Sequence, residues 1–370
     1  MTTLGDLLDS LTVEGKLYET LEDGSVRCLA CGHRCVIKPG RRGVCQVRFN
    51  RDGKLMVPWG YVAGLQADPI EKKPFYHFMP GSDALTFGML GCDMHCSFCQ
   101  NWLTSQALRD PAADIAGRFI RRTTPEEIIQ AALRAGASTI ASSYNEPLIS
   151  IEWAVDIFRL AKQHGLKTVF VSNGHATPEA LAFLKPWLDG YKVDLKTMNP
   201  REYHKLGGNL NRVLDTIRAA HEMGFWVEVV TLVIPGYNDS VDMLMDAARF
   251  IASVSPNIPW HVTAFHPDYK MTEPPPTSVE TLIRAAEIGQ EAGLHFVYAG
   301  NLPGHVGEYE HTLCPHCGAP LIKRWGYIIE AYHITAEGTC PRCGKPVPGV
   351  WPDDPAKVRL GGPGRPRLVW

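Results

Sequence analysis

Between about residues 84 and 300, short apolar runs alternate with longer amphipathic stretches. The apolar runs have the length of buried strands, and the stretches between them carry helix signals. One helix should begin after Thr124 and end at Gly136, and another should begin after Thr177. Repeated strand–helix units with buried strands predict an α/β fold with a parallel sheet. The predicted strands are 84–90, 137–142, 167–172, 189–194, 225–233, 259–265 and 294–298.

A polar cluster follows each predicted strand at its C-terminal end. In parallel sheets and barrels, ligands bind at this edge, so seven converging clusters predict one large site. Each cluster alone is also compatible with ordinary loop chemistry. The clusters are 92–99, 142–147, 172–175, 194–196, 234–239, 266–269 and 300–304.

Composition narrows the class of protein. The chain has 370 residues and a formal net charge of −2, which gives no bulk electrostatic case for binding nucleic acid or an anionic membrane. The N-terminus lacks the pattern of a signal peptide, and the most apolar stretch, 225–235, is too short to span a bilayer. Eleven cysteines without an export signal therefore predict metal sites in a reducing cytoplasm rather than disulfides.

The cysteines fall into three groups with none left over. The two terminal groups each offer four soft ligands, enough to close a structural metal site. Two C-x2-C-G knuckles in the C-terminal group predict a zinc ribbon or rubredoxin-like site. The N-terminal spacing, C-x2-C-x3-C-x9-C, fits either zinc or a complete iron–sulfur cluster that relays electrons. The groups are Cys314, Cys317, Cys340 and Cys343 at one end, and Cys28, Cys31, Cys35 and Cys45 at the other.

The middle group, Cys92, Cys96 and Cys99, has the spacing C-x3-C-x2-C after the first predicted strand. A [4Fe–4S] cluster normally takes four cysteines, so three leave one iron open for a reactive ligand. The alternative is a zinc site with His95 as fourth ligand, although this residue lies inside the loop and has poor geometry for that role.

This motif resembles the signature of radical S-adenosylmethionine (SAM) enzymes. In that family the open iron chelates SAM, and an electron from the cluster splits SAM into methionine and a 5′-deoxyadenosyl radical. Similarity to pyruvate formate-lyase activating enzyme-like proteins covers about residues 84–300. Similarity to the radical SAM protein of the AmmeMemoRadiSam gene system covers nearly the whole chain. The resemblance implies a partial (β/α)6 TIM-like barrel with an irregular seventh strand.

The resemblance also assigns residues to the two ends of the SAM methionine. Glu146 and nearby carbonyls would accept from the SAM ammonium, and Lys196, in an Asp194-x-Lys motif, would pair with the carboxylate. The family has two glycines where this chain has Tyr144 and Asn145, so its backbone should approach the ligand less closely there.

The remaining expected SAM contacts come from the other clusters. In the third cluster the activases carry a carboxylate that helps to hold a monovalent cation. This chain has Val171-Ser172-Asn173 in that region, so the cation site is not expected in full. The cofactor-binding residues implied are Phe98, Asn101, Asn145, Glu146, Ser172, Asn173, Asp194, Lys196, Ile234 and His266.

Four segments are expected. They are an N-terminal cysteine-rich metal-binding segment (1–83), the barrel (84–305), the zinc-ribbon-like segment (306–352) and a flexible basic tail (353–370). The predicted function is radical SAM chemistry on an unidentified substrate. The expected partners are a reductant such as ferredoxin or flavodoxin and Memo-like and AMMECR-like proteins. One alternative is an activase that makes a glycyl radical in a partner protein. The other is a non-catalytic metal scaffold for protein or nucleic acid.

Overall fold

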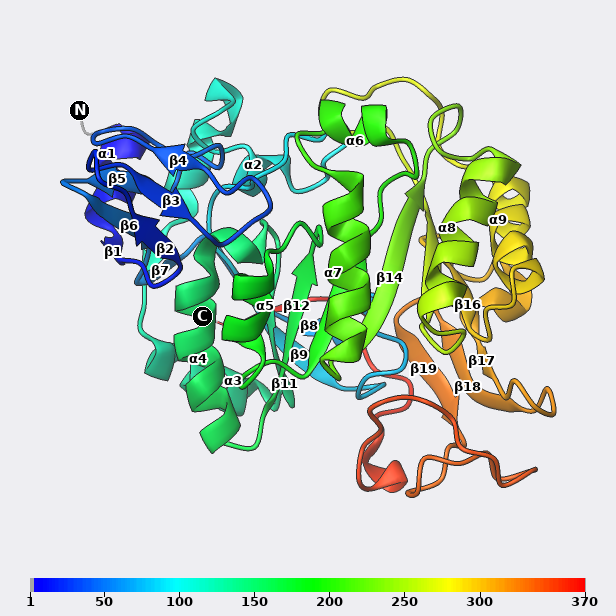
Figure 1. Ribbon diagram of the computed structural model, residues 1–370. Helices are drawn as coiled ribbons and strands as arrows, with labels where there is room; N and C mark the ends of the chain where they lie inside the picture. The colour runs from blue at the N-terminus through cyan, green and yellow to red at the C-terminus, as the bar shows by residue number, and fades with distance from the viewer. Residues whose placement is uncertain (1–2, 370) are drawn as a thin grey trace.

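The computed structural model describes residues 3–369 of the chain. Its centre is a curved sheet of nine strands in the order β16-β15-β14-β13-β12-β11-β9-β8-β20 (Figure 1). The seven strands from β9 to β16 are mutually parallel, and β8 (Gly64–Pro69) runs antiparallel beside β9. The parallel strands are β9 (Asp83–Gly88), β11 (Thr139–Ser142), β12 (Lys167–Ser172), β13 (Gly190–Asp194), β14 (Trp226–Val233), β15 (Trp260–Ala264) and β16 (Val297–Gly300). Each of the seven predicted strands has a counterpart, although the last, expected at 294–298, is observed at Val297–Gly300.

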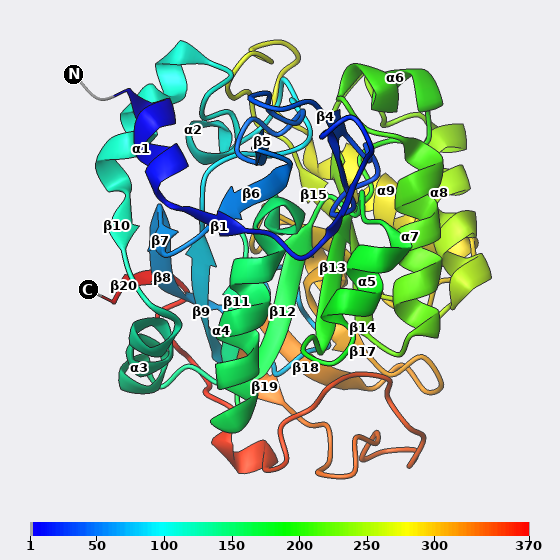
Figure 2. The ribbon, with the colours of Figure 1, turned by 60° about the vertical axis from the view of Figure 1, so that its left-hand side comes forward.

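Helices cover the outer face of the sheet (Figure 2). Thr124 caps α3 with a reciprocal capping box to Glu127, and Gly136 ends it in the left-handed conformation, as the sequence predicted. The sheet order does not return to its first strand, so the barrel is partial. The helices are α3 (Pro125–Ala135), α4 (Ile151–Gln163), α5 (Pro178–Leu184), α6 (Pro200–Lys205), α7 (Leu210–Glu222), α8 (Val241–Val254) and α9 (Val279–Glu291).

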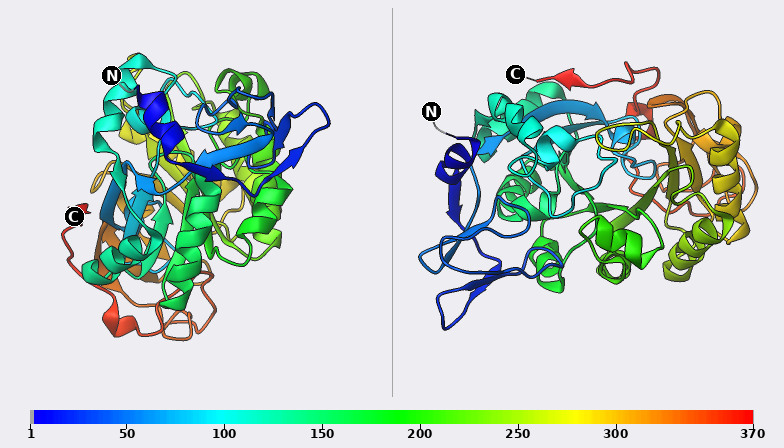
Figure 3. Two further views of the ribbon diagram at one scale, coloured as in Figure 1. Left: turned by 90° about the vertical axis from the view of Figure 1, so that its left-hand side faces the viewer. Right: turned by 90° about the horizontal axis from the view of Figure 1, so that it is seen from above.

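The N-terminal segment packs beside the cysteine loop that follows β9 and against α4 (Figure 3). Its anchor is Arg48, whose Nη2 lies 2.6 Å from Oε1 of Glu152 on α4, with both side chains buried. A buried ion pair of this kind is costly to break, because either partner alone would be left as an uncompensated charge. The segment contains α1 (Leu4–Ser10), β1 (Thr12–Glu14), β2 (Tyr18–Thr20), β3 (Val26–Cys28), β4 (Val36–Ile37), β5 (Phe49–Arg51), β6 (Lys54–Pro58) and β7 (Tyr61–Val62). A short strand, β10 (Arg121–Arg122), pairs with β7.

The C-terminal ribbon comprises β17 (Thr312–Leu313), β18 (Pro320–Trp325) and β19 (Ile328–Tyr332), and it lies on the opposite side of the molecule from the N-terminal segment. His77 joins it to the barrel: Nδ1 lies 2.7 Å from the Pro348 carbonyl, and Nε2 lies 2.6 Å from the Tyr298 hydroxyl. A carbonyl only accepts, so Nδ1 carries the proton and Nε2 accepts from Tyr298. Thr312 continues the chain of bonds at 2.8 Å from Tyr298.

The tail differs from the expected flexible segment. Arg367 and Leu368 form β20, which pairs with β8, while residue 370 lies outside the described part. Arg359 and Arg367 both donate to the carboxylate of Asp83 at the start of β9. This carboxylate is 5% exposed and needs cationic partners, which a basic tail supplies. Sequence composition could not reveal this pairing.

No helix within residues 3–369 combines the length and the apolar character that crossing a membrane requires.

Candidate functional site

The loop that carries the middle cysteines begins where β9 ends. Gly91 has a φ of 101°, and a Cβ there would lie 2.9 Å from Cγ2 of Val47 and 3.2 Å from the Cys45 carbonyl oxygen. Only glycine fits this close approach of the N-terminal segment. The three cysteines of the loop line the cavity described below. Cys96 is 7% exposed, and Cys92 and Cys99 are partly buried.

Asp93 fixes this loop from within. Its Oδ1 accepts from Asn173 Nδ2 at 2.7 Å, and its Oδ2 accepts from His175 Nδ1 at 2.9 Å. Burial alone would raise the pKa of Asp93, but the hydrogen bonds and the nearby imidazole of His175 lower it. The residue is therefore a carboxylate that ties the cysteine loop to the loop after β12.

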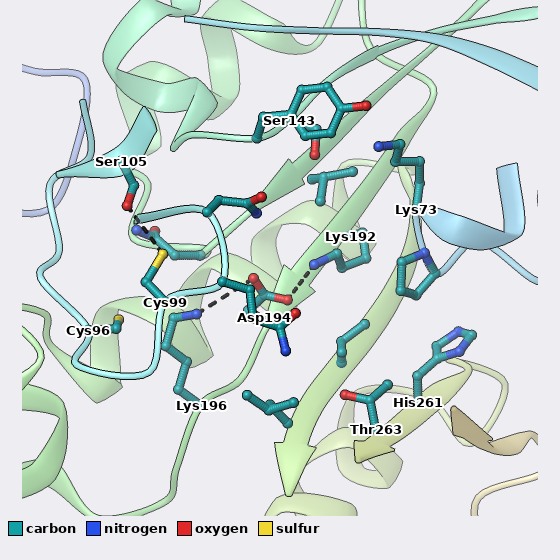
Figure 4. Close-up of a pocket in the computed structure, with 18 of the residues that line it drawn as sticks. Lys73, Cys96, Cys99, Ser105, Ser143, Lys192, Asp194, Lys196, His261 and Thr263 are labelled. Atoms are coloured by element: carbon teal, nitrogen blue, oxygen red, sulfur yellow. Dashed lines mark hydrogen bonds and ion pairs between the residues drawn. The ribbon is translucent and has the colours of Figure 1, made fainter. Parts of the chain in front are cut away.

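A cavity of about 400 Å³ opens among the C-terminal strand ends, and the three cysteines form part of its wall. Figure 4 shows Cys96 and Cys99 on one side and Lys192, His261 and Thr263 on the other, with Asp194 between them. The cavity thus joins the cysteine loop to the interior of the barrel. Ten predicted site residues line it: Cys92, Cys96, Phe98, Cys99, Asn101, Asn145, Glu146, Asn173, Asp194 and Lys196.

A lysine lies beside the cysteines with a carboxylate at its side. Nζ of Lys196 is 3.6 Å from Oδ2 of Asp194, and Lys192 bonds the other oxygen of the same group. Burial alone would lower the pKa of Lys196, but Asp194 and the nearby Cys96 sulfur raise it above its ordinary value. Lys196 is therefore a permanent cation in the cavity wall.

The cysteine thiols are difficult to ionise without a metal. Burial raises the pKa of Cys96 to about 12, against the opposing effect of Lys196. Burial also raises the pKa of Cys92 and Cys99. Thiols whose pKa is raised are poor nucleophiles at neutral pH, whereas a bound metal takes thiolate directly. The site therefore has the character of a ligand set.

Glu146 is already engaged within the protein. Its Oε1 accepts from Ser172 Oγ at 2.7 Å and from Leu148 N at 3.0 Å, and its Oε2 accepts from Asn173 N at 2.7 Å. Burial, followed by the negative charge of Asp93, raises its pKa. The carboxylate lines the cavity, but its first effect is to hold the loop after β12 in place.

Tyr144 takes the backbone conformation that a glycine would adopt. Its φ is 68°, and its hydroxyl donates to Asp68 Oδ2 at 2.5 Å while Nζ of Lys73 lies 4.2 Å from the ring centroid. These contacts stabilise a conformation that is unfavourable for a bulky residue. The sequence predicted that the backbone at Tyr144 would approach the ligand less closely than in the family. Because Tyr144 keeps a glycine-like φ, the backbone angle gives no reason for such a loss.

Three of the predicted cofactor-binding residues lie outside the cavity wall. Ser172 is fully buried behind Glu146, and Ile234 is fully buried with its N–H bonded to Asn238 Oδ1 at 2.7 Å. His266 is exposed at the rim, with Nε2 3.0 Å from Nε2 of Gln100, which lines the cavity.

Sequence reasoning missed two groups of positioning residues. Asn238 donates to the carbonyls of Lys196 and Leu232, both at 2.8 Å, and so joins the loops after β13 and β14. Asp93 and His175 form the buried pair already described. Asp93, His175 and Asn238 all fall in the predicted polar clusters, but nothing in the sequence indicated these contacts.

The two terminal cysteine groups differ in geometry. All four C-terminal sulfurs lie within 4.8 Å of one another, with Cys314 to Cys343 at 3.6 Å and Cys317 to Cys340 at 3.7 Å. Among the described residues, the four N-terminal sulfurs do not form such a close set. Instead, Cys31 lies within that distance of ligand atoms of Asp93 and His175.

The middle cysteines suit a polynuclear cluster better than one ion. Four thiolates around zinc at about 2.3 Å would place their sulfurs about 3.8 Å apart. The middle three do not all lie within 4.8 Å of one another in the described structure. A [4Fe–4S] cluster presents a separate iron to each cysteine and so accepts wider spacing. The adjoining cavity and the Lys196 cation leave room for an anionic ligand at the open iron.

Comparisons with known proteins identify what the chain is similar to. The radical SAM superfamily matches residues 87–251. The uncharacterized protein MJ0808 of Methanocaldococcus jannaschii is 40% identical over 333 residues, 89% of this chain and 96% of that protein. The pyruvate formate-lyase 1-activating enzyme of Escherichia coli K12 is 25% identical over 236 residues, 58% of this chain and 91% of the relative. A solved domain of the corresponding Bacteroides vulgatus enzyme aligns with a TM-score of 0.38 and 23% identity, covering 44% of this chain and 98% of that domain.

Proposed function

The chain belongs to the radical SAM superfamily of enzymes, and from that membership we propose that it cleaves SAM reductively and abstracts hydrogen from a substrate held in the cavity. The observation that carries the proposal is the shared wall: Cys92, Cys96 and Cys99 face the same space as Asp194 and Lys196. Superfamily membership implies a [4Fe–4S] cluster and SAM, and the donor set fits both. With SAM bound, such a cluster would supply the electron that splits SAM into methionine and a 5′-deoxyadenosyl radical.

The residues of the wall have separate tasks in this proposal. Lys196 holds the SAM carboxylate, since it is a buried cation beside the cysteine loop. Asp194 keeps that ammonium in place and prevents the two lysines from repelling each other. Asn145, whose Oδ1 accepts from Met89 N at 3.0 Å, orders the strand end that precedes the cysteines.

Glu146 remains the proposed acceptor for the SAM ammonium. Each carboxylate oxygen has two lone pairs, so the three internal hydrogen bonds leave capacity for one more donor. A cation there would also favour the ionised carboxylate, whose pKa burial raises. Phe98, with its ring 5.8 Å from that of Tyr237, is proposed to face the adenine. Asn101, Asn173 and His266 complete the proposed contacts, while Ser172 and Ile234 support the cavity wall from behind.

The substrate side of the cavity is polar. Lys73 and Lys192 enter it, each paired with a carboxylate, and Tyr327 of the ribbon region closes one part of the wall. We assign hydrogen abstraction from an unidentified molecule, in company with Memo-like and AMMECR-like partners. A low-potential reductant such as ferredoxin or flavodoxin would supply electrons. Zinc is proposed for the C-terminal ribbon, whose sulfur spacing suits one tetrahedral ion.

An activase function is the second candidate, and its support is the similarity to the Escherichia coli activating enzyme over 91% of that relative. In this case the hydrogen would come from a glycine of a partner protein. A cytoplasmic location is proposed for both candidates, because none of the eleven cysteines forms a disulfide within residues 3–369 and all three groups need reduced sulfur to bind metal.

The two candidates are separated by following the abstracted hydrogen. The anaerobically reconstituted enzyme is incubated with SAM and either small-molecule extracts or candidate partner proteins in deuterated form. Deuterium in 5′-deoxyadenosine with a small-molecule fraction supports the first candidate. A protein glycyl radical signal in electron paramagnetic resonance (EPR), formed with loss of one deuterium from glycine, supports the second. Absence of SAM cleavage under all conditions would contradict both.

A further inference from the structure

The N-terminal cysteines are packed directly onto the catalytic loop. His33 Nε2 lies 3.2 Å from the Asp93 carbonyl oxygen, and Arg109 donates both to the Val44 carbonyl and to the Met94 carbonyl. Together with the Gly91–Cys45 approach, these contacts place both edges of the N-terminal cysteine loop against residues 91–94. A metal site that served only to stabilise the N-terminal segment would not require contacts with the catalytic loop.

A bridge of three side chains connects the two cysteine groups. Ligand atoms of Cys31, Asp93 and His175 lie within 4.8 Å of one another, and Asp93 Oδ1 is 3.8 Å from the Cys92 sulfur. Asn173 Nδ2 lies 3.9 Å from the same sulfur. Nε2 of His175 is buried without a hydrogen-bond partner among the described residues, on the side that faces Gly32 between the N-terminal cysteines. The Asp93 side chain therefore lies near both Cys31 and Cys92.

The spacing of the N-terminal sulfurs differs from the spacing expected of a zinc site. The ribbon cysteines of the same chain have the close spacing that one tetrahedral ion requires. The N-terminal group lacks it and in this respect matches the catalytic cysteines. Three of its four members, Cys28, Cys31 and Cys45, are less than 9% exposed, so a cluster there would be shielded from solvent.

We propose that Cys28, Cys31, Cys35 and Cys45 hold a second iron–sulfur cluster, which passes electrons one at a time to the catalytic cluster across residues 91–94. The electron transfer rests on the proposed function, whereas the metal assignment does not. A low-potential one-electron protein donor is oxidised by one electron and reduces the N-terminal cluster. That electron then moves past Asp93 to the catalytic cluster, where it is consumed in breaking the sulfur–C5′ bond of SAM.

Metal analysis of the full chain tests the assignment. Wild type, purified anaerobically, should hold about eight irons and about one zinc. The Cys92→Ala/Cys96→Ala/Cys99→Ala variant should keep about four irons, with the EPR signal of one reduced cluster. About two zincs and no iron in that variant would overturn the proposal. Equal iron in the two proteins would instead contradict the catalytic assignment. Mössbauer spectra of the wild type count the clusters even when the variant does not fold.

The electron route is tested with Cys45→Ser. With dithionite, which can reach the catalytic cluster directly, the variant should still form 5′-deoxyadenosine. With reduced flavodoxin its rate should fall at least tenfold below that of wild type. Cys340→Ser, in the ribbon, is the matched control and should retain the flavodoxin-dependent rate. Equal flavodoxin-dependent rates for Cys45→Ser and wild type would overturn the route.

Discussion

Oδ2 of Asp93 and Nδ1 of His175 are 2.9 Å apart in a pair that is almost completely buried. The pair joins the loop after β9 to the loop after β12, two strands away in the sheet. It lies directly beside Cys92 and Cys31, so both cysteine groups depend on its geometry.

Removing the carboxylate should destabilise the protein strongly. Asp93→Ala leaves the His175 ring and the Asn173 amide without their acceptor, and breaking a buried pair costs about 3–5 kcal/mol. Anaerobic urea denaturation of the metal-loaded protein measures this change. Asp215→Ala, which removes an exposed ion pair with Arg218, is the control and should cost about 0–1 kcal/mol. Similar losses for the two variants would contradict the role of Asp93.

Lys196→Met should weaken SAM binding by about tenfold or more, because a charge-assisted hydrogen bond in a partly dry site contributes about 1.5–3 kcal/mol. Anaerobic calorimetric titration of the cluster-loaded variant measures the affinity. Lys205→Met, which removes an exposed ammonium near Glu202, is the matched control. Unchanged affinity in Lys196→Met would remove this lysine from the site.

Loss of the metal from the ribbon should leave SAM cleavage intact. Cys340→Ser removes one of four closely spaced ligands, so the variant should lose zinc and become sensitive to protease within the ribbon. Its catalytic cluster should still form and cleave SAM. Loss of cleavage together with zinc would show that the ribbon serves more than structure.

Acid should loosen the ribbon through His77. Burial lowers its pKa to about 4 from an ordinary 6.5, so below that ordinary value the unfolded chain takes up a proton that the folded chain excludes. The stability is therefore complete above about pH 6.5 and falls as the pH approaches 4. Between pH 7 and pH 5 the loss should be about 2 kcal/mol.

His77→Asn serves as the control for this prediction, because it cannot titrate. Free energies of unfolding for both proteins at pH 7 and pH 5 give a difference in which the other titrating groups cancel. An equal acid-induced loss in the two proteins would contradict the assignment to His77.

The order of elements was predictable because each strand is a short apolar run and several helices carry explicit caps, as Thr124 and Gly136 show. The residues at the strand ends were predictable because parallel strands bring them to one edge. Contacts between distant polar residues were not, since no local pattern links Asp83 to Arg367 or Asp93 to His175. For the same reason, the sequence could not decide between zinc and an iron–sulfur cluster at the N-terminal cysteines. Ligand spacing along the chain does not fix the distances between sulfurs.

Reductive cleavage of SAM tests the central claim most directly. Reconstituted wild type, reduced anaerobically with dithionite, should form methionine and 5′-deoxyadenosine in equal amounts. The Cys92→Ala/Cys96→Ala/Cys99→Ala variant should form neither, because the iron that binds SAM would have no ligands. Equal 5′-deoxyadenosine formation by the two proteins would contradict the account.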